Sequence, residues 1–201
     1  MFAHVNGPTE EEKRTAARLE LSADFRSAMR MLATTVSVVT TADEGIWYGM
    51  TATAVTSLCA DPCALLVCIN QATSSHGAVA YTRQFCVNLL EARQEPVARA
   101  FAGQLNGQSR FDVGSWSADP KGLPYLEGAQ ASIFCDVDQS VAYRTHTIFV
   151  GRVRDVRHHL VRSPLIYHDG QYAEVSRLQH PKQVKGSDMH RSLNEPVVND
   201  G

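Results

Sequence analysis

Residues 49–57 read Gly49-Met50-Thr51-Ala52-Thr53-Ala54-Val55-Thr56-Ser57. The run combines small side chains with hydroxyl donors and lies between two segments rich in strand-forming residues. Small residues let a planar ring approach the backbone, and hydroxyl and main-chain N–H groups can hydrogen-bond ring heteroatoms or a phosphate. The pattern supports two interpretations: a surface that binds a flat ligand, or a threonine-rich strand whose hydroxyls face solvent.

Strand patterns continue on both sides of this run. β-branched residues fill positions 35–41, and apolar and polar side chains alternate along 131–138. Asp169-Gly170 is a favoured two-residue hairpin turn. The predicted strands cover residues 35–41, 46–56, 64–69, 84–91, 131–138, 147–156, 165–167 and 172–173. Six or more antiparallel strands with a few short helices indicate a mainly β chain that forms a barrel with helical decorations.

Three short helices and one long loop complete the predicted elements. Ser22 is the expected N-cap of the first helix, whose apolar residues recur along one face over residues 25–32. The second helix runs over 74–81 and is capped by Ser74-Ser75, and the third lies around 97–101. Residues 103–128 contain glycines and prolines and are predicted to form a surface loop.

This pattern divides the chain into three parts. Residues 1–21 are polar and are predicted to be a loose lead-in. Residues 22–176 form the single predicted domain. Residues 177–201 are polar and aperiodic, and we expect a mobile tail or an arm that wraps a partner.

Composition restricts the class of partner and the compartment. The formal net charge is −2, so no strong field favours nucleic acid or an anionic membrane. The apolar run at residues 64–69 is far shorter than the ~20 residues that span a bilayer, and the first twenty residues lack an apolar signal core. The five cysteines are odd in number and show no CxxC spacing. We therefore expect a cytoplasmic protein with buried, free thiols.

Familiar catalytic motifs are absent from the sequence. It contains no GxGxxG, GxxxxGK[ST], HExxH or GxSxG pattern. His158 and His159 are adjacent and would face opposite sides of a strand, so no metal site is expected. Asp136 and Asp138 share a strand face, which favours a solvated outer face over a catalytic pair. The cluster at residues 73–75 precedes a helix and is either an anion site or a simple cap.

Taken together with Asp61-Pro62, the run at residues 49–57 resembles the GMTASSFTSVSxDPP signature of short-chain flavin reductases with an FMN-binding split β-barrel. The likeness extends over residues 25–172. Other blocks that match in the same order are Asn70, Ser74 with His76, and residues 85–90, 101–103, 122–126, 146–153 and 164–167.

The resemblance implies an enzyme in which NADH or NADPH reduces FMN or FAD, and the reduced flavin passes to a separate monooxygenase. It also implies a homodimer with the flavin near the subunit interface. The residues implied to line the isoalloxazine are Met50, Thr51, Ala52 and Thr53. Those implied to hold the ribityl chain and phosphate are Ser57, Asn70 and Ser74. Phe101 is expected beside the flavin, and His146 on the nicotinamide side.

The sequence departs from the family pattern before His146, where Arg144-Thr145 replaces Gly-Asp. Arg144 is therefore expected to reach a nicotinamide phosphate and alter the choice between NADH and NADPH. Two alternatives follow from the same resemblance. One is a flavin-binding protein without NAD(P)H turnover, and the other is a reductase of a bulkier acceptor such as a corrinoid.

Overall fold

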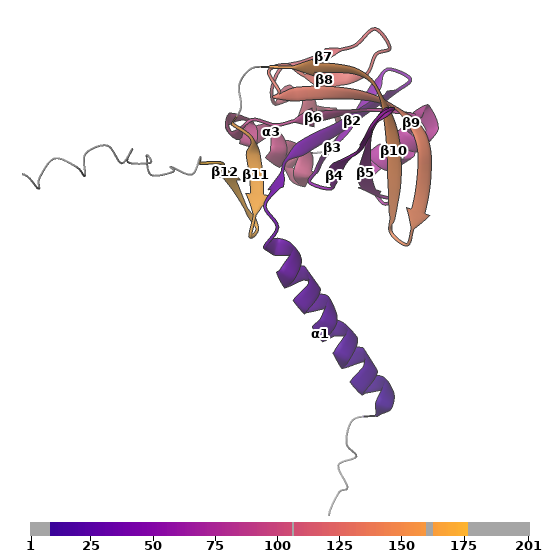
Figure 1. Ribbon diagram of the computed structural model, residues 1–201, viewed down its shortest axis with the longest axis vertical. Coiled ribbons are helices and arrows are strands. Elements are labelled where there is room, and N and C mark those ends of the chain that lie inside the picture. The colour runs from indigo at the N-terminus through magenta and orange to yellow at the C-terminus, as the bar shows by residue number, and fades with distance from the viewer. Residues whose placement is uncertain (1–8, 106, 160–162, 177–201) are drawn as a thin grey trace, which may run out of the picture.

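The computed structural model describes residues 9–105, 107–159 and 163–176. Its main element is a seven-stranded antiparallel sheet in the order β3-β2-β6-β9-β10-β5-β4 (Figure 1). These strands are β3 (Ile46–Ala52), β2 (Ser37–Asp43), β6 (Gln84–Leu89), β9 (Ala131–Tyr143), β10 (His146–His158), β5 (Cys63–Asn70) and β4 (Val55–Ala60). Between the edge strands β3 and β4 there are only residues 53 and 54, so the sheet must curl until its two edges approach each other. The prediction of a mainly β chain is confirmed.

The smaller elements lie around this curled sheet. β1 (Thr34–Thr35), β11 (Leu165–His168) and β12 (Gln171–Glu174) form a three-stranded sheet, and β7 (Trp116–Ala118) pairs with β8 (Pro124–Leu126). The helices are α1 (Glu10–Arg30), α2 (Ser74–Thr82), η1 (Ala92–Gln94), α3 (Glu95–Arg99), the π-helical turn η2 (Ala100–Gln104) and η3 (Gly107–Asp112). The predicted hairpin at Asp169-Gly170 is confirmed, because both residues have positive φ between β11 and β12.

Three apolar clusters are buried in the described residues; the smallest consists of Cys86, Leu123 and Phe134, and the two larger ones form most of the interior. The first lies inside the curled sheet and is built around Phe85 and Phe149, which are 0 % and 1 % exposed. The second lies under α3 and η2, where Phe101, Phe111 and Trp116 pack with ring centroids 4.9–5.1 Å apart. The second cluster connects the helical segment after β6 to the main sheet, and the candidate site lies at this junction.

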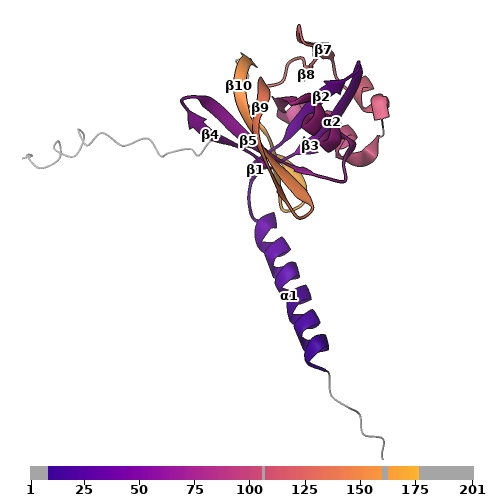
Figure 2. The same ribbon diagram turned by 90° about the vertical axis from the view of Figure 1, so that its right-hand side faces the viewer.

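The first helix begins earlier than the sequence predicts. α1 covers Glu10–Arg30, with Thr9 as N-cap. The Thr9 hydroxyl accepts a hydrogen bond from the Glu12 N–H, and the Glu12 carboxylate accepts one from the Thr9 N–H at 2.7 Å. Ser22, the expected N-cap, is therefore in mid-helix, because this reciprocal cap starts the helix before the apolar residues appear. α1 extends away from the sheet and buries none of its residues (Figures 1 and 2).

Residues 103–128 are not one loop, contrary to the prediction. They contain η3 and the β7–β8 hairpin, whose turn is held by Asp119. The Asp119 carboxylate accepts hydrogen bonds from the N–H groups of Lys121 and Leu123 and pairs with Arg154 at 2.5 Å. Burial raises the pKa of Asp119, but its hydrogen bonds to Arg154 and the backbone outweigh burial and hold the pKa below its ordinary value. A partner thirty-five residues away therefore orders this segment.

Cysteine placement confirms only part of the prediction. Cys86 and Cys135 are buried and free, and burial raises the pKa of both thiols, that of Cys135 to about 12. Cys59 and Cys63 are also free, but they are exposed on the β4–β5 hairpin. The prediction of burial was wrong for these two because Cys59 lies on the edge strand β4, which is exposed after Val55, and Cys63 is the exposed first residue of β5 beside it.

Three other expectations can be compared with the structure. Thr73, rather than Ser74-Ser75, is the N-cap of α2 and makes no side-chain cap, so the predicted cap was wrong. Asp138 is exposed, whereas Asp136 is half-buried and pairs with Lys121 and Arg154. No helix in the described residues is both long and apolar enough to cross a bilayer. The predicted tail at 177–201 lies outside the described residues.

Candidate functional site

Four segments that are distant in sequence line one cavity of about 340 Å³, which we call the β3–α2 cavity. They are the second half of β3, the start of α2, the π-helical turn η2 and η3. Its lining residues are Gly49, Met50, Thr51, Thr73, Ser74, Ser75, Phe101, Ala102, Gly103 and Arg110. The structure therefore brings together four of the predicted site residues: Met50, Thr51, Ser74 and Phe101.

Phe101 forms a wall of the cavity because residue 49 is glycine. A Cβ on Gly49 would lie 2.6 Å from Cε1 of Phe101, closer than carbon atoms can approach. The ring is 3 % exposed and packs edge-on against Phe111, with centroids 4.9 Å apart. Small residues in the 49–57 run thus let an aromatic side chain approach the backbone of β3, as the sequence suggested they would do for a ring.

Thr51 and Ser74 occupy the same cavity but differ in their hydrogen bonding. The Thr51 hydroxyl donates to the Ala98 carbonyl oxygen at 2.6 Å and so ties β3 to α3. Among the described residues, the Ser74 hydroxyl has no hydrogen-bond partner, and Thr73 donates its hydroxyl to Asn70 instead of capping the helix. Ser74 and the uncapped first turn of α2 are therefore available to a ligand, whereas Thr51 has a structural partner.

Arg110 is a site residue that sequence reasoning missed. Its Nη1 donates to the Gly49 carbonyl oxygen at 2.6 Å, and its Nη2 donates to that of Leu105 at 3.3 Å. The buried Nε has no acceptor, and within the described part of the chain the guanidinium has no carboxylate partner. Its positive charge thus faces the same cavity as the start of α2. No local pattern identifies Arg110, because the sequence predicts a loop over residues 103–128, where the structure has η3.

The other predicted residues lie elsewhere. Thr53 lines a second cavity of about 280 Å³ that shares Thr51 and Ala102 with the first. Ala52 is 7 % exposed and belongs to the core, and Ser57 is exposed on β4. Asn70 accepts a hydrogen bond from the Ala72 N–H at 3.0 Å and shapes the turn before α2. The structure does not bring these four into the β3–α2 cavity.

His146 and Arg144 lie at the tip of the β9–β10 hairpin. Arg144 has φ +52° in the turn, and His146 is exposed beside Thr145, its ring Nδ1 lying 2.9 Å from that hydroxyl. The tip is tied to the helix of the cavity, because Thr147 Oγ1 lies 2.8 Å from Nε2 of His76 on α2. His146 thus lies next to the cavity-forming segment without lining the cavity.

Comparisons with known proteins agree with this arrangement. The family model described as "Flavin reductase like domain" matches residues 29–176. FMN reductase (NADH) RutF from Pseudomonas syringae is 39% identical over 148 residues, covering 74% of this chain and 83% of that protein. The reductase component of the FADH(2)-dependent resorcinol hydroxylase from Rhizobium sp. is 37% identical over 155 residues, covering 76% and 87%.

Solved structures give the same result. BorF, the flavin reductase component of a bacterial two-component tryptophan halogenase, superposes with a TM-score of 0.71 at 31% identity, covering 78% of this chain and 99% of that one. Flavin reductase PheA2 superposes with a TM-score of 0.71 at 32% identity, covering 77% and 98%. The predicted split-barrel fold class is confirmed.

Proposed function

Because the chain belongs to the flavin reductase-like family, we propose that it is an NAD(P)H:flavin oxidoreductase that supplies reduced flavin to a separate monooxygenase. BorF and the resorcinol hydroxylase protein are named as reductase components that serve a halogenase and a hydroxylase, and PheA2 is named as a flavin reductase. The observation that carries the proposal is the β3–α2 cavity, which unites the family signature on β3 with Ser74, Phe101 and Arg110.

The lining of the cavity fits FMN or FAD. Arg110 contributes a positive charge with an unpaired, buried Nε, and the start of α2 adds N–H groups and the positive end of its dipole. Met50, Thr51 and the Phe101 wall offer a mostly apolar surface for a ring. Arg110 and Ser74 would hold the phosphate, and Met50, Thr51 and Phe101 would flank the ring.

When bound, the flavin supplies the redox chemistry by accepting a hydride from the nicotinamide. Arg110 is the one ionisable side chain that lines the β3–α2 cavity. The chain's own contribution is therefore to bind and orient the two rings at contact distance, which lowers the entropic part of the barrier. The exposed hairpin tip with His146 and Arg144 would guide the nicotinamide nucleotide.

Nucleotide oxidation tests this function directly. Purified protein mixed with NADH or NADPH and with FMN or FAD should oxidise at least one nucleotide in a flavin-dependent manner, followed at the nicotinamide absorbance band. Flavin binding without oxidation of either nucleotide would instead support a flavin carrier, the alternative that Arg144-Thr145 motivates.

Substitution of His146 by alanine should impair nicotinamide use while leaving flavin binding intact. Losing one hydrogen bond to the nucleotide costs about 0.5–1.5 kcal/mol, so kcat/KM for the nucleotide should fall roughly two- to tenfold. His158→Ala, on an exposed residue at the far end of β10, is the control. An equal loss of FMN affinity, measured by fluorescence titration, would place His146 at the flavin instead.

Thr51→Val should lower the stability of the fold, whereas Ser74→Ala should lower the affinity for FMN. Thr51→Val removes the hydrogen bond to Ala98 and should lower the free energy of unfolding by about 0.5–1.5 kcal/mol. Ser74→Ala should leave stability unchanged and weaken FMN binding by about 0.5–3 kcal/mol, the upper end applying to a bond with phosphate. Urea unfolding and flavin titration of both variants measure the two quantities. Unchanged FMN affinity in Ser74→Ala would remove Ser74 from the site.

We also propose a homodimer in which α1 is part of the interface. The apolar side chains of Leu21, Phe25, Met29 and Leu32 recur along one face of α1 and its C-terminal end and are 47–69 % exposed. A second copy would cover this face, since contiguous exposed apolar surface marks interaction sites.

Location in the cytoplasm stays a prediction, supported by five free cysteines.

Charge on this face should separate the copies. The double variant Leu21→Glu, Phe25→Glu is expected to shift the mass measured by light scattering from a dimer to the 22.1 kDa monomer. Glu20→Gln is the control, because its side chain points away from that face at about 100° per residue. A native protein that is monomeric at micromolar concentration would contradict the proposal.

A further inference from the structure

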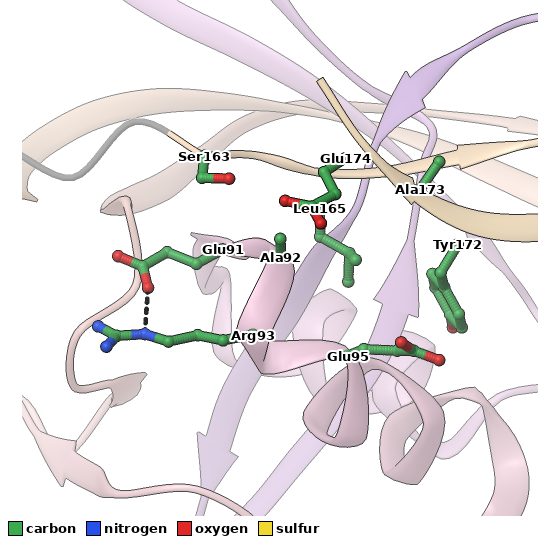
Figure 3. Close-up of a pocket in the computed structure, with 9 residues that line it drawn as sticks. All are labelled: Glu91, Ala92, Arg93, Glu95, Ser163, Leu165, Tyr172, Ala173 and Glu174. Atoms are coloured by element: carbon green, nitrogen blue, oxygen red, sulfur yellow. Dashed lines mark hydrogen bonds and ion pairs between the residues drawn. The ribbon is translucent and has the colours of Figure 1, made fainter. Parts of the chain in front are cut away.

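The hollow between η1 and the β11–β12 hairpin is largely neutralised by ion pairs of its own. Figure 3 shows Glu91 beside Arg93, whose Nε donates to Oε2 of Glu91 at 2.5 Å. Glu95 is paired with Arg99 at 2.5 Å. The tip of the β9–β10 hairpin differs, because in the described part of the chain Nε2 of the exposed His146 has no hydrogen-bond partner. A ring nitrogen is therefore available to a ligand at this tip.

The β9–β10 hairpin extends beyond the rest of the main sheet. β6 pairs with β9 only as far as Asp136, so from residue 139 onward β9 has β10 as its one strand neighbour in the described residues. Residues 138–143 of β9 are all exposed. A two-stranded ribbon is only marginally stable by itself. The position of His146 therefore depends on what holds β10 from its other side.

The turn between β5 and α2 holds β10 on that side. β5 ends at Asn70, which lies opposite His146, and Gln71 follows. The Gln71 N–H donates to the Thr145 carbonyl oxygen at 2.9 Å. Its side-chain Nε2 donates to the His146 carbonyl oxygen at 3.2 Å and to Thr147 Oγ1 at 3.3 Å. A carbonyl oxygen can only accept, so the amide must present its nitrogen here.

Thr147 has a second contact, with the helix of the β3–α2 cavity. Thr147 is 6 % exposed, and its Oγ1 lies 2.8 Å from Nε2 of His76. The His76 ring also packs against Phe149, with ring centroids 5.5 Å apart. His76 lies on α2, two residues after Ser74 of the cavity. We call Gln71, His76 and Thr147 the Thr147 clamp, which joins the start of α2 to the hairpin tip.

The turn that carries Gln71 is itself fixed. The Asn70 carbonyl oxygen accepts hydrogen bonds from the N–H and the hydroxyl of Thr73, at 3.1 and 2.8 Å. The side-chain Oδ1 of Asn70 accepts from the Ala72 N–H at 3.0 Å. Gln71 therefore cannot follow a movement of the tip without breaking these bonds. The clamp thus fixes the place of His146 relative to α2.

We propose that the Thr147 clamp positions His146 for the nicotinamide nucleotide, with Gln71, His76 and Thr147 as positioning residues. The inference rests on the proposed role of His146 in nucleotide binding. Held by the clamp, the imidazole keeps a constant place relative to the start of α2, where the flavin phosphate is proposed to bind. Because the two rings must meet at contact distance, a tip that moves freely would lower the productive fraction of bound nucleotide.

Thr147→Val removes the hydroxyl that Gln71 and His76 share and keeps the shape of the side chain. The value of kcat/KM for the nucleotide should fall about two- to tenfold, as expected for lost hydrogen bonds. FMN affinity, measured by fluorescence titration, should stay within about twofold, because the clamp does not line the flavin cavity. Thr147→Ser restores the hydroxyl and should recover most of the loss.

Gln71→Met removes the amide donors without altering a buried side chain, so it keeps the test valid if Thr147→Val folds poorly. Its kcat/KM for the nucleotide should fall about two- to fivefold. Gln139→Met is the matched control. Gln139 is exposed on the same hairpin and, among the described residues, its side chain makes no hydrogen bond. This variant should match the native protein.

Double variants decide whether the clamp acts through His146. Gln71→Met added to His146→Ala should lower kcat/KM no further than His146→Ala alone, because the imidazole that Gln71 positions is absent. Additive losses would overturn the proposal, since Gln71 would then act independently of His146. Unchanged kcat/KM in both Thr147→Val and Gln71→Met would overturn it as well.

Hydrogen exchange separates failure of this proposal from failure of the proposed function. Without flavin or nucleotide, the amides of residues 141–148 should exchange several-fold faster in Gln71→Met than in the native protein, and should be unchanged in Gln139→Met. A native protein that oxidises neither nucleotide would overturn the reductase function and the role of the tip with it. Unchanged exchange in Gln71→Met, in a protein that does oxidise nucleotide, would overturn the clamp alone.

Discussion

Gly151→Ala is expected to destabilise the protein by about 1–3 kcal/mol, which lowers Tm by roughly 2–12 °C for a chain of this size. A Cβ on Gly151 would collide with Cζ of Phe85 and lie 2.8 Å from Cβ of Cys135. Both neighbours are fully buried in the first apolar cluster, so neither can move away without disturbing the core. Gly151 also lies where the register of β10 against β9 shifts, in the middle of the main sheet. Thermal and urea unfolding measure the loss.

Gly77→Ala is the matched control for this substitution. Gly77 lies in α2, and a Cβ there would meet no atom within 4 Å. Alanine has the higher helix propensity, so this variant should gain about 0.5–1 kcal/mol. A Gly151→Ala variant as stable as the native protein would contradict the close packing of β10 against Phe85.

Arg110→Met is expected to weaken FMN binding by about 2 kcal/mol or more, a roughly thirtyfold rise in Kd. The guanidinium is the one charged group in the β3–α2 cavity, and its Nε is unpaired. Removing it takes away the positive partner of a phosphate in a half-buried setting. It also breaks the bonds to Gly49 and Leu105, so the free protein should lose about 0.5–1.5 kcal/mol of stability per bond.

Comparing flavins separates the two effects of Arg110. Riboflavin lacks the phosphate, so its affinity should change far less than that of FMN in Arg110→Met. Arg110→Lys retains the charge and should recover part of the FMN affinity, while losing the two-pronged contact that a guanidinium makes. Arg18→Met on exposed α1 is the control for total charge. Equal losses for FMN and riboflavin would assign Arg110 to the architecture of the wall rather than to the phosphate.

Local patterns in the sequence predicted most of the sheet. The alternation along β9, the β-branched run of β2 and the Asp169-Gly170 turn are properties of neighbouring residues, and the structure confirms all three. The residues of the 49–57 run also identified one wall of the cavity, since a small residue at position 49 is a local requirement for the approach of Phe101. These features follow from the backbone conformations that a few adjacent residues favour, so they can be predicted without knowledge of distant contacts.

The sequence alone did not determine what completes the site. Arg110 enters the cavity because η3 packs against β3, sixty-one positions away, and no pattern near Arg110 carries that contact. The sequence predicts a loop around Asp119, because the order of this segment depends on the distant partner Arg154. Likewise, Thr51 and Ser74 look alike as hydroxyls, yet only Thr51 has a backbone acceptor, supplied by α3. Such partners are set by the register and curl of the whole sheet, and these long-range contacts are formed only in the tertiary structure.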